Sequence, residues 1–196
     1  MAKGRKIAII GAGIAGCATA HALARRGYTV DLIEKNTEIA NGTSGNPRSL
    51  VHLNPAQRLT PAMRFRFNAY LFALRHYSSL SEGADFNWKP EGIFRLARSQ
   101  QEQDAMAIIM QRQLYDEAHV LTVDALEINE IAKFVSENPG FYFPDAGSLD
   151  PAALCHAWIR HKNIQLFTSH EVLDFQRKTN RWCVTLLANG EKGTSE

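Results

Sequence analysis

The most constraining feature of the sequence is a glycine-rich hexapeptide near the N-terminus, Gly11-Ala12-Gly13-Ile14-Ala15-Gly16. It matches the pattern GxGxxG, follows an apolar run at residues 6–10, and opens residues 14–26, whose small apolar side chains suit a helix packed on a sheet. The apolar run is expected to be a central parallel strand buried on both faces. Gly27 is well placed to end the helix. Together these features predict a dinucleotide site in which the helix N-terminus receives a pyrophosphate, with a glycine-rich turn in an unrelated α/β protein as the alternative.

A carboxylate at the end of the next predicted strand, residues 28–34, supports the dinucleotide interpretation. Glu34 follows Gly11 by 23 positions, where a carboxylate can accept hydrogen bonds from the hydroxyls of an adenosine ribose. A carboxylate also repels a 2′-phosphate, although the neighbouring Lys35 would soften that repulsion. NADP is therefore the least favoured of the dinucleotides.

The segment after Glu34 favours FAD over NAD. Residues 36–47 are rich in Asn, Gly, Thr and Ser, and they predict a long ordered loop in place of the regular βα alternation of a nicotinamide-type Rossmann domain. Within this loop, hydroxyls and backbone N–H groups that can reach a pyrophosphate, a ribityl chain or a flavin ring come from Thr43, Ser44, Gly45 and Asn46. The alternative is an ordinary surface loop.

The remainder of the chain mixes predicted helices and strands. Helices are expected at about 60–78, 100–115, 123–134 and 151–161, the first buried on two sides because Phe65 and Phe72 form a second apolar stripe. Asp150 and Pro151 predict the start of the last helix. Strands are expected at 86–97 with a turn at 90–92, at 141–148 with a turn, at 164–172 and at 181–187. Asn189-Gly190 predicts a hairpin turn whose return strand would be missing.

Composition excludes several classes of protein. The formal net charge of +2 gives little long-range attraction for a polyanion. Cys17, Cys155 and Cys183 are odd in number and lie in apolar runs, which predicts free buried thiols in a reducing cytosol and no metal site. There is no signal-peptide pattern and no apolar run of about 18 residues, so a cytoplasmic location without a membrane span is expected.

At these residues the sequence resembles the FAD-dependent amine and amino-acid oxidoreductases of the D-amino-acid-oxidase (DAO) superfamily. More narrowly, it is similar to the C-terminal oxidoreductase domain of the bifunctional tRNA-modifying MnmC family, through TSGNPRSLVHLNPAQR at 43–58, FALRHY at 72–77 and FYFPDAGSLDPAALCHAW at 141–158. The resemblance implies an α/β, Rossmann-like FAD-binding fold of the DAO/glutathione-reductase type with an inserted α+β substrate region. Residues 1–196 would be the N-terminal part of one oxidoreductase domain, with 6–60 and about 150–190 binding FAD, about 80–145 in the substrate region, and the C-terminal part absent.

The same resemblance implies roles for particular residues. Gly11 to Gly16 would bind the pyrophosphate, Glu34 and Lys35 the adenosine ribose, Thr43 to Asn46 the diphosphate and flavin, and Val172 the adenine through its backbone. It implies oxidation of the carboxymethylaminomethyl group on the tRNA wobble uridine, which gives the aminomethyl uridine and glyoxylate, and a methyltransferase domain in the full-length protein. No catalytic acid or base is required, and none is named.

Several alternatives stay open. An Arg would suit a substrate carboxylate, and the available ones are Arg48, Arg58, Arg64, Arg66, Arg75 and Arg95. Arg64, Arg66, Arg75 and His76 interleave with aromatic residues. They either contact tRNA, or form a solvated helix face or pack their aliphatic stems over core aromatics, and the second interpretation is favoured. The alternative functions are a small-molecule amine or amino-acid oxidase or dehydrogenase on the same scaffold, and a dinucleotide-binding fragment without catalysis.

Overall fold

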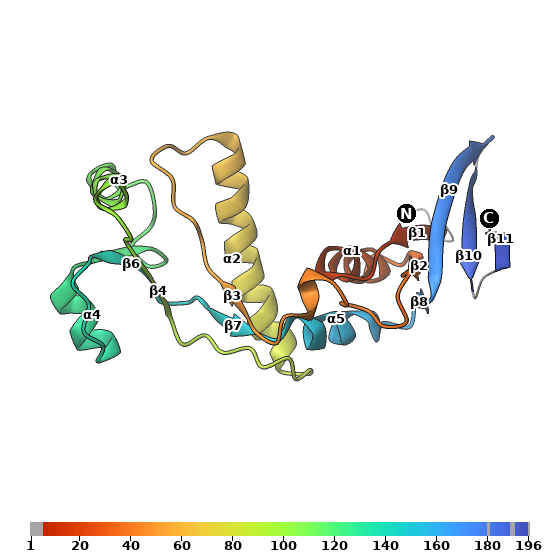
Figure 1. The fold of residues 1–196 in the computed structure, drawn as a ribbon, viewed down its shortest axis with the longest axis horizontal. Coiled ribbons are helices and arrows are strands. Elements are labelled where there is room, and N and C mark those ends of the chain that lie inside the picture. Colours follow the sequence, from red (N-terminus) through yellow and green to blue (C-terminus); the bar gives the residue numbers. More distant parts are fainter. Residues whose placement is uncertain (1–5, 180, 189–190, 196) are drawn as a thin grey trace. The chain divides into compact units, whose positions relative to one another are not determined.

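The computed structural model describes residues 6–179, 181–188 and 191–195 as an α/β protein with two compact units. The first unit comprises Met1–Arg48 and Asp150–Glu196, and the second comprises Ser49–Leu149. The chain therefore leaves the first unit after residue 48 and returns to it at residue 150 (Figure 1).

A parallel sheet forms the centre of the first unit, in the order β1-β2-β8. Its strands are β1 (Lys6–Ile10), β2 (Thr29–Ile33) and β8 (Ile164–Phe167). The strands expected at 6–10 and 28–34 are confirmed, but the expectation that the first is central is wrong. In the described sheet β1 pairs with β2 alone and its side chains alternate in exposure, so that Ile10 is 56% exposed. β2 pairs on both sides, and Val30 to Ile33 are buried as a result.

Two helices of the first unit pack against one another, α1 (Ile14–Ala24) and α5 (Pro151–Ile159). Gly27 has φ +88°, a conformation that glycine adopts without strain, and its N–H bonds to Ala24 O at the end of α1, as expected. The carboxylate of Asp150 accepts the Ala153 N–H at 3.0 Å, which confirms the predicted start of α5.

A second sheet of the first unit is antiparallel, in the order β11-β10-β9. It contains β9 (His170–Lys178), β10 (Arg181–Ala188) and β11 (Glu191–Ser195). The single strand expected at 164–172 is instead two strands, β8 and β9, because the chain turns at Ser169, where φ is +56°. The turn expected at Asn189-Gly190 lies outside the described residues. The return strand expected to be missing is present as β11, which pairs with β10.

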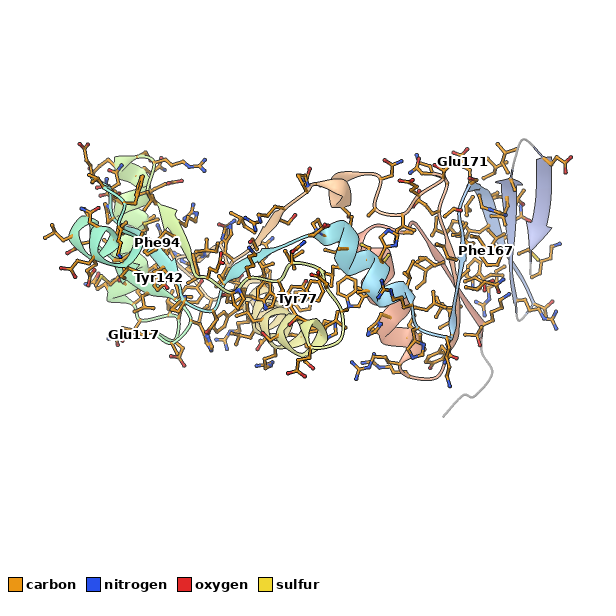
Figure 2. The ribbon with its side chains drawn as sticks, turned by 90° about the horizontal axis from the view of Figure 1, so that it is seen from below. Tyr77, Phe94, Glu117, Tyr142, Phe167 and Glu171 are labelled. Atoms are coloured by element: carbon orange, nitrogen blue, oxygen red, sulfur yellow. The ribbon has the colours of Figure 1, made fainter. Side chains whose placement is uncertain are left out.

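The second unit contains three helices and two small antiparallel sheets. One sheet pairs β3 (Ser49–Val51) with β7 (Gly147–Leu149), and the other has the order β4-β6-β5. In the latter, β4 (Ile93–Leu96) and β5 (Leu121–Val123) flank β6 (Gly140–Phe143). Phe94 of β4 and Tyr142 of β6 lie side by side (Figure 2). Their rings are stacked, with centroids 4.5 Å apart. The strand expected at 86–97 is therefore shorter, with a bridge from Lys89 to Ser148 before it.

The helices of the second unit are α2 (Pro61–Ser81), α3 (Gln100–Gln111) and α4 (Ala125–Ala132), and all three were expected. Side chains of Thr60, Ser99 and Asp124 cap their N-termini. The expectation that α2 is buried on two sides is wrong. Met63, Tyr70 and Leu74 are buried in the core, whereas Phe65 is 74% and Phe72 is 62% exposed, because they lie on the opposite side of the helix.

Candidate functional site

The glycine turn between β1 and α1 has the geometry that the hexapeptide predicts. Gly11 has φ +94°, a region that side-chain-bearing residues rarely adopt, and its N–H bonds to Ile33 O at 2.7 Å. A methyl group on residue 16 would lie 1.9 Å from Gly11 O, so only glycine allows α1 to approach the turn this closely. The first and third glycines of the pattern are therefore explained by backbone conformation and by helix–strand packing.

The N-terminus of α1 faces the loop that follows Glu34. Its N-cap is Gly13, which has no capping side chain, and the Ile14 N–H instead donates to Ser44 Oγ at 3.0 Å. Ser44 lies in the 3-10 turn η1 (Thr43–Gly45), and a methyl group on Gly13 would be 3.3 Å from its Oγ. The structure thus brings Gly13, Ile14 and Ser44 together at the positive end of a helix dipole.

This loop is held against the glycine turn by its backbone. The Ala40 N–H donates to Ala12 O at 3.0 Å, and Gly45 lies so near that a methyl group on it would be 2.7 Å from Ala40 O. Gly45 also closes η1 through a bond from its N–H to Gly42 O. Between β2 and β3, where every residue is described, the chain contains only the short turn η1, in line with the loop expected from the sequence, and these contacts tie the loop to the glycine turn.

Glu34 is buried directly beside the glycine turn. Its Oε2 accepts the Ala12 N–H at 2.8 Å, and its Oε1 accepts two donors of Asn36, the backbone N–H at 3.0 Å and the side-chain Nδ2 at 2.7 Å. A carboxylate has about four acceptor positions, so at least one remains for a hydroxyl. Sequence reasoning missed Asn36, whose only signal is its position two residues after the carboxylate that ends a strand.

The start of β9 is tied to the same residue. The Glu34 N–H donates to Phe167 O at 2.8 Å, and Glu34 O accepts the His170 N–H at 2.9 Å. Val172 follows two residues later, partly buried, beside a bulge in the pairing of β9 with β10. The start of β9 therefore lies next to the backbone of Glu34.

Three predicted site residues are less closely tied to the turn. Lys35, Thr43 and Asn46 are exposed, Lys35 directly after Glu34 and the other two at the ends of η1. The hydrogen bonds described above come instead from their neighbours Glu34 and Ser44.

A pair of buried thiols lies under the turn. The single S–H of Cys17, on α1, can donate either to Ala12 O, which lies 3.4 Å from Sγ, or in a hydrogen bond to Cys155 of α5. That hydrogen bond, followed by burial, raises the pKa of the Cys17 thiol, which keeps it neutral. The expectation of free, buried cysteines is confirmed for Cys17, Cys155 and Cys183. The pairing of Cys17 with Cys155 beside the turn was not foreseen.

The donors and acceptors around the turn fit a dinucleotide. The helix N-terminus and the small residues beside it suit a diphosphate, and the buried Glu34 carboxylate suits a ribose diol. Within the described part of the chain, no group of three or more His, Cys, Asp or Glu side chains could hold a metal ion. Across the same residues, none of the helices has the length and apolar character needed to span a bilayer.

Comparison with protein families and curated relatives agrees with this geometry. The family model described as FAD dependent oxidoreductase, DAO, matches residues 6–195. The chain is 36% identical over 189 residues to the tRNA 5-methylaminomethyl-2-thiouridine biosynthesis bifunctional protein MnmC of Thiobacillus denitrificans, covering 91% of this chain and 29% of that protein. It is 31% identical to the protein of that name from Pseudomonas syringae pv. tomato, covering 92% of this chain and 27% of that protein. The chain thus spans less than a third of these relatives.

Solved structures share the fold over about half of their length. Glycine oxidase from Bacillus cereus has a TM-score of 0.74 at 25% identity, covering 97% of this chain and 52% of the oxidase. L-alpha-glycerophosphate oxidase from Mycoplasma pneumoniae, solved with FAD bound, has a TM-score of 0.72 at 20% identity, covering 95% and 50%. The α/β Rossmann-like fold expected from the sequence is confirmed, and the chain belongs to the DAO family of FAD-dependent oxidoreductases.

Proposed function

We propose that this chain supplies the FAD-binding half of an oxidoreductase that removes the carboxymethyl group from carboxymethylaminomethyl uridine at the wobble position of tRNA. The observation that carries the proposal is the packing of Glu34, Ala12 and Ser44 around the glycine turn, in a chain about 30% identical to MnmC proteins. FAD, when bound, supplies the acceptor for the hydride of the substrate.

The residues of the turn would bind the cofactor in distinct ways. The turn from Gly11 to Gly16 and the hydroxyl of Ser44 would hold the diphosphate, since they surround the N-terminus of α1. The N–H groups of Gly11, Ala12 and Ile14 are already bonded within the protein, so the direct donors would be the N–H groups of the other residues of the turn. Glu34 would accept the ribose hydroxyls and Asn36 would fix the orientation of that carboxylate. Lys35, Thr43, Gly45 and Asn46 would line the outer side of the cofactor, and Val172 would meet the adenine through its backbone.

The reaction balances without a protein acid or base. Loss of a hydride and a proton converts the CH–NH bond of the substrate to C=N, and water then splits this imine into glyoxylate and the aminomethyl uridine. The tRNA and a methyltransferase domain are the partners proposed for the full-length protein, because the curated relatives are bifunctional and much longer than this chain. The protein's task is to orient the C–H bond and to hold the cofactor.

The proposal is tested in two steps. Purified chain is titrated with FAD and with NAD, and binding is followed by flavin fluorescence and absorbance. We expect FAD to bind and NAD not to compete. The chain is then incubated with tRNA that carries the carboxymethylaminomethyl uridine, and nucleosides are identified by mass spectrometry. Formation of aminomethyl uridine with an equal amount of glyoxylate supports the proposal, and a chain that binds NAD alone refutes it.

A small-molecule amine or amino-acid oxidase is the second candidate. It is favoured by the likeness to glycine oxidase, which at 25% identity matches nearly the whole of this chain. Release of glyoxylate from free N-substituted glycines, without turnover of the modified tRNA, would support this candidate instead. A chain that binds FAD but oxidises neither substrate would be a cofactor-binding fragment.

A further inference from the structure

Charge is strongly segregated along the second unit. Residues 49–81, which contain β3 and α2, carry four Arg and no Asp or Glu, whereas residues 82–149 carry five Lys or Arg and twelve Asp or Glu. Helix α2 itself has three Arg, one His and no acidic residue in 21 positions. A basic helix in an otherwise acidic unit indicates a local site for an anionic partner, which the net charge of the whole chain conceals.

The arginines of α2 are not neutralised within the unit. Of the ion pairs among the described residues, none involves Arg64, Arg66 or Arg75, and all three side chains are exposed. Arg64 Nε makes a long 3.4 Å bond to Leu59 O. Guanidinium groups in this state can form paired hydrogen bonds with phosphate oxygens.

Two aromatic side chains share the same open face. At about 100° per residue, Phe65 and Phe72 lie roughly 20° apart around the helix axis and about 10 Å apart along it. Phe72 is roughly 160° from the buried Tyr70. The side of a surface helix that faces away from the core is normally polar, so two exposed phenylalanines beside basic residues are consistent with a contact surface. Arg64 and Arg75 border them at one edge of the stripe, within roughly 60–100° of the rings.

One of these rings already belongs to a flat stack. Phe72 and His76, one turn apart on α2, have ring centroids 5.5 Å apart and planes only 13° from parallel. The outer face of the Phe72 ring can extend this stack by one more planar group. Basic side chains beside exposed aromatic rings are the combination with which proteins bind unpaired nucleotides, because the rings stack on bases and the cations contact the phosphates.

We propose that the face of α2 formed by Arg64, Phe65, Phe72 and Arg75 binds unpaired nucleotides of an RNA substrate. The inference rests on the proposed function, since it gives the tRNA a surface outside the cofactor site. A lipid surface would also attract arginines, but the exposed apolar stripe of α2 contains only two large side chains, and the polar Asn68 lies on the same face. A protein partner would not require three arginines with no acidic residue between them.

The test measures RNA binding directly, without turnover. Fluorescence anisotropy follows the chain's binding to a labelled anticodon stem–loop RNA and to a fully paired RNA of equal length. We expect the stem–loop to bind more tightly, and Phe72→Ala to weaken it by at least about fivefold while changing duplex binding little. Arg64→Gln with Arg75→Gln should lower the slope of log affinity against log salt by about 1.4.

Matched controls come from the acidic part of the same unit. Leu126→Ala removes an apolar side chain of α4 that is 73% exposed, and Arg98→Gln removes an exposed arginine, so both should leave RNA binding unchanged. Circular dichroism and urea unfolding check each variant. Phe65→Ala, at the more exposed ring, repeats the test if Phe72→Ala proves unstable.

The outcomes separate this inference from the proposed function. Stem–loop binding that is equal in wild type, Phe72→Ala and the double arginine variant overturns the surface on α2, and formation of glyoxylate from modified tRNA would still support the reaction. Failure of the wild-type chain to bind the stem–loop at low salt also overturns the surface. A change from dimer to monomer in Phe72→Ala, with RNA affinity unaltered, would show that a second copy covers this face.

Discussion

Replacing Gly16 by Ala should damage both the stability of the first unit and its binding of FAD. The added methyl group would lie 1.9 Å from Gly11 O, whereas real Cβ atoms essentially never come closer than 3.0 Å to a backbone atom. The N-terminus of α1 must therefore move away from the glycine turn by about 1 Å. Overpacking of this kind costs about 1–3 kcal/mol of folding free energy, since the obstacle is backbone and cannot rotate aside.

The same movement lengthens the contacts that an anion would make at this helix. N–H···O bonds weaken once the heavy atoms are separated by more than about 3.2 Å, so a 1 Å shift removes most of their value. We expect the dissociation constant for FAD to rise at least about tenfold, or about 1.4 kcal/mol. Flavin fluorescence titration measures the affinity and urea unfolding, followed by circular dichroism, measures the stability.

Two other glycines make the comparison specific. Gly83→Ala, in the second unit, should be nearly silent, because nothing lies within 4 Å of the added methyl group and its φ is not positive. Gly11→Ala has equal space but φ +94°, so it should cost about 1–2 kcal/mol through backbone strain alone. If Gly16→Ala unfolds at the wild-type urea concentration and binds FAD as tightly as wild type, the close approach of α1 to the turn is not a requirement and the reasoning fails.

Three further substitutions address single contacts. Asn36→Ala removes the 2.7 Å bond to Glu34 Oε1 and should weaken FAD binding about tenfold, whereas Lys35→Ala, at an exposed neighbour, should change it less; equal effects would argue against the positioning role. Tyr70→Phe should leave the free energy of unfolding unchanged or raise it by up to about 1 kcal/mol. The reason is that no described group hydrogen-bonds the buried Tyr70 hydroxyl, and burial raises the pKa of Tyr70 to about 12. A loss of more than about 1 kcal/mol in urea unfolding would reveal a hydrogen-bond partner. Burial lowers the pKa of His21, so as pH falls the unfolded chain binds a proton before the folded chain does. The free energy of unfolding should therefore decrease as pH drops below about 6.5. Unfolding curves measured at successive pH values should show a weaker pH dependence in His21→Gln.

The elements that sequence reasoning predicted well depend on short-range requirements. Gly11, Gly16 and Gly27 are dictated by the local backbone, through a positive φ or a contact within a few residues. The same is true of Asp150, whose side chain caps the helix that begins at the next residue. Glu34 was identified by its place at the end of the second predicted strand, 23 positions after Gly11. Such requirements act over one or two turns of chain, so the sequence displays them directly.

The features that were missed depend on contacts between distant segments. Cys17 and Cys155 meet because α1 and α5 pack together, and no local pattern states that pairing. The edge position of β1 depends on which strands join the sheet, and its apolar sequence is compatible with either place. Phe65 and Phe72 followed a helical period correctly, but periodicity does not tell which stripe faces the core. The charge segregation around α2 can be read from the sequence, but the exposure of Phe65 and Phe72 was needed to suggest what this helix binds.

The side chains of Ser44 and Glu34 hydrogen-bond to the glycine turn in a way that favours an anion at the N-terminus of α1. Because Ser44 Oγ accepts the Ile14 N–H, its own O–H proton is turned away from the helix and is polarised by the positive end of the α1 dipole. Ser44 therefore extends the reach of the helix N-terminus. Glu34 contributes a negative charge instead: its carboxylate accepts the Ala12 N–H and fixes the turn on the side where a ribose would lie. Positive and negative groups are thus held apart before any ligand binds, which reduces the entropy lost on binding and favours a ligand with a phosphate at one end and a diol at the other.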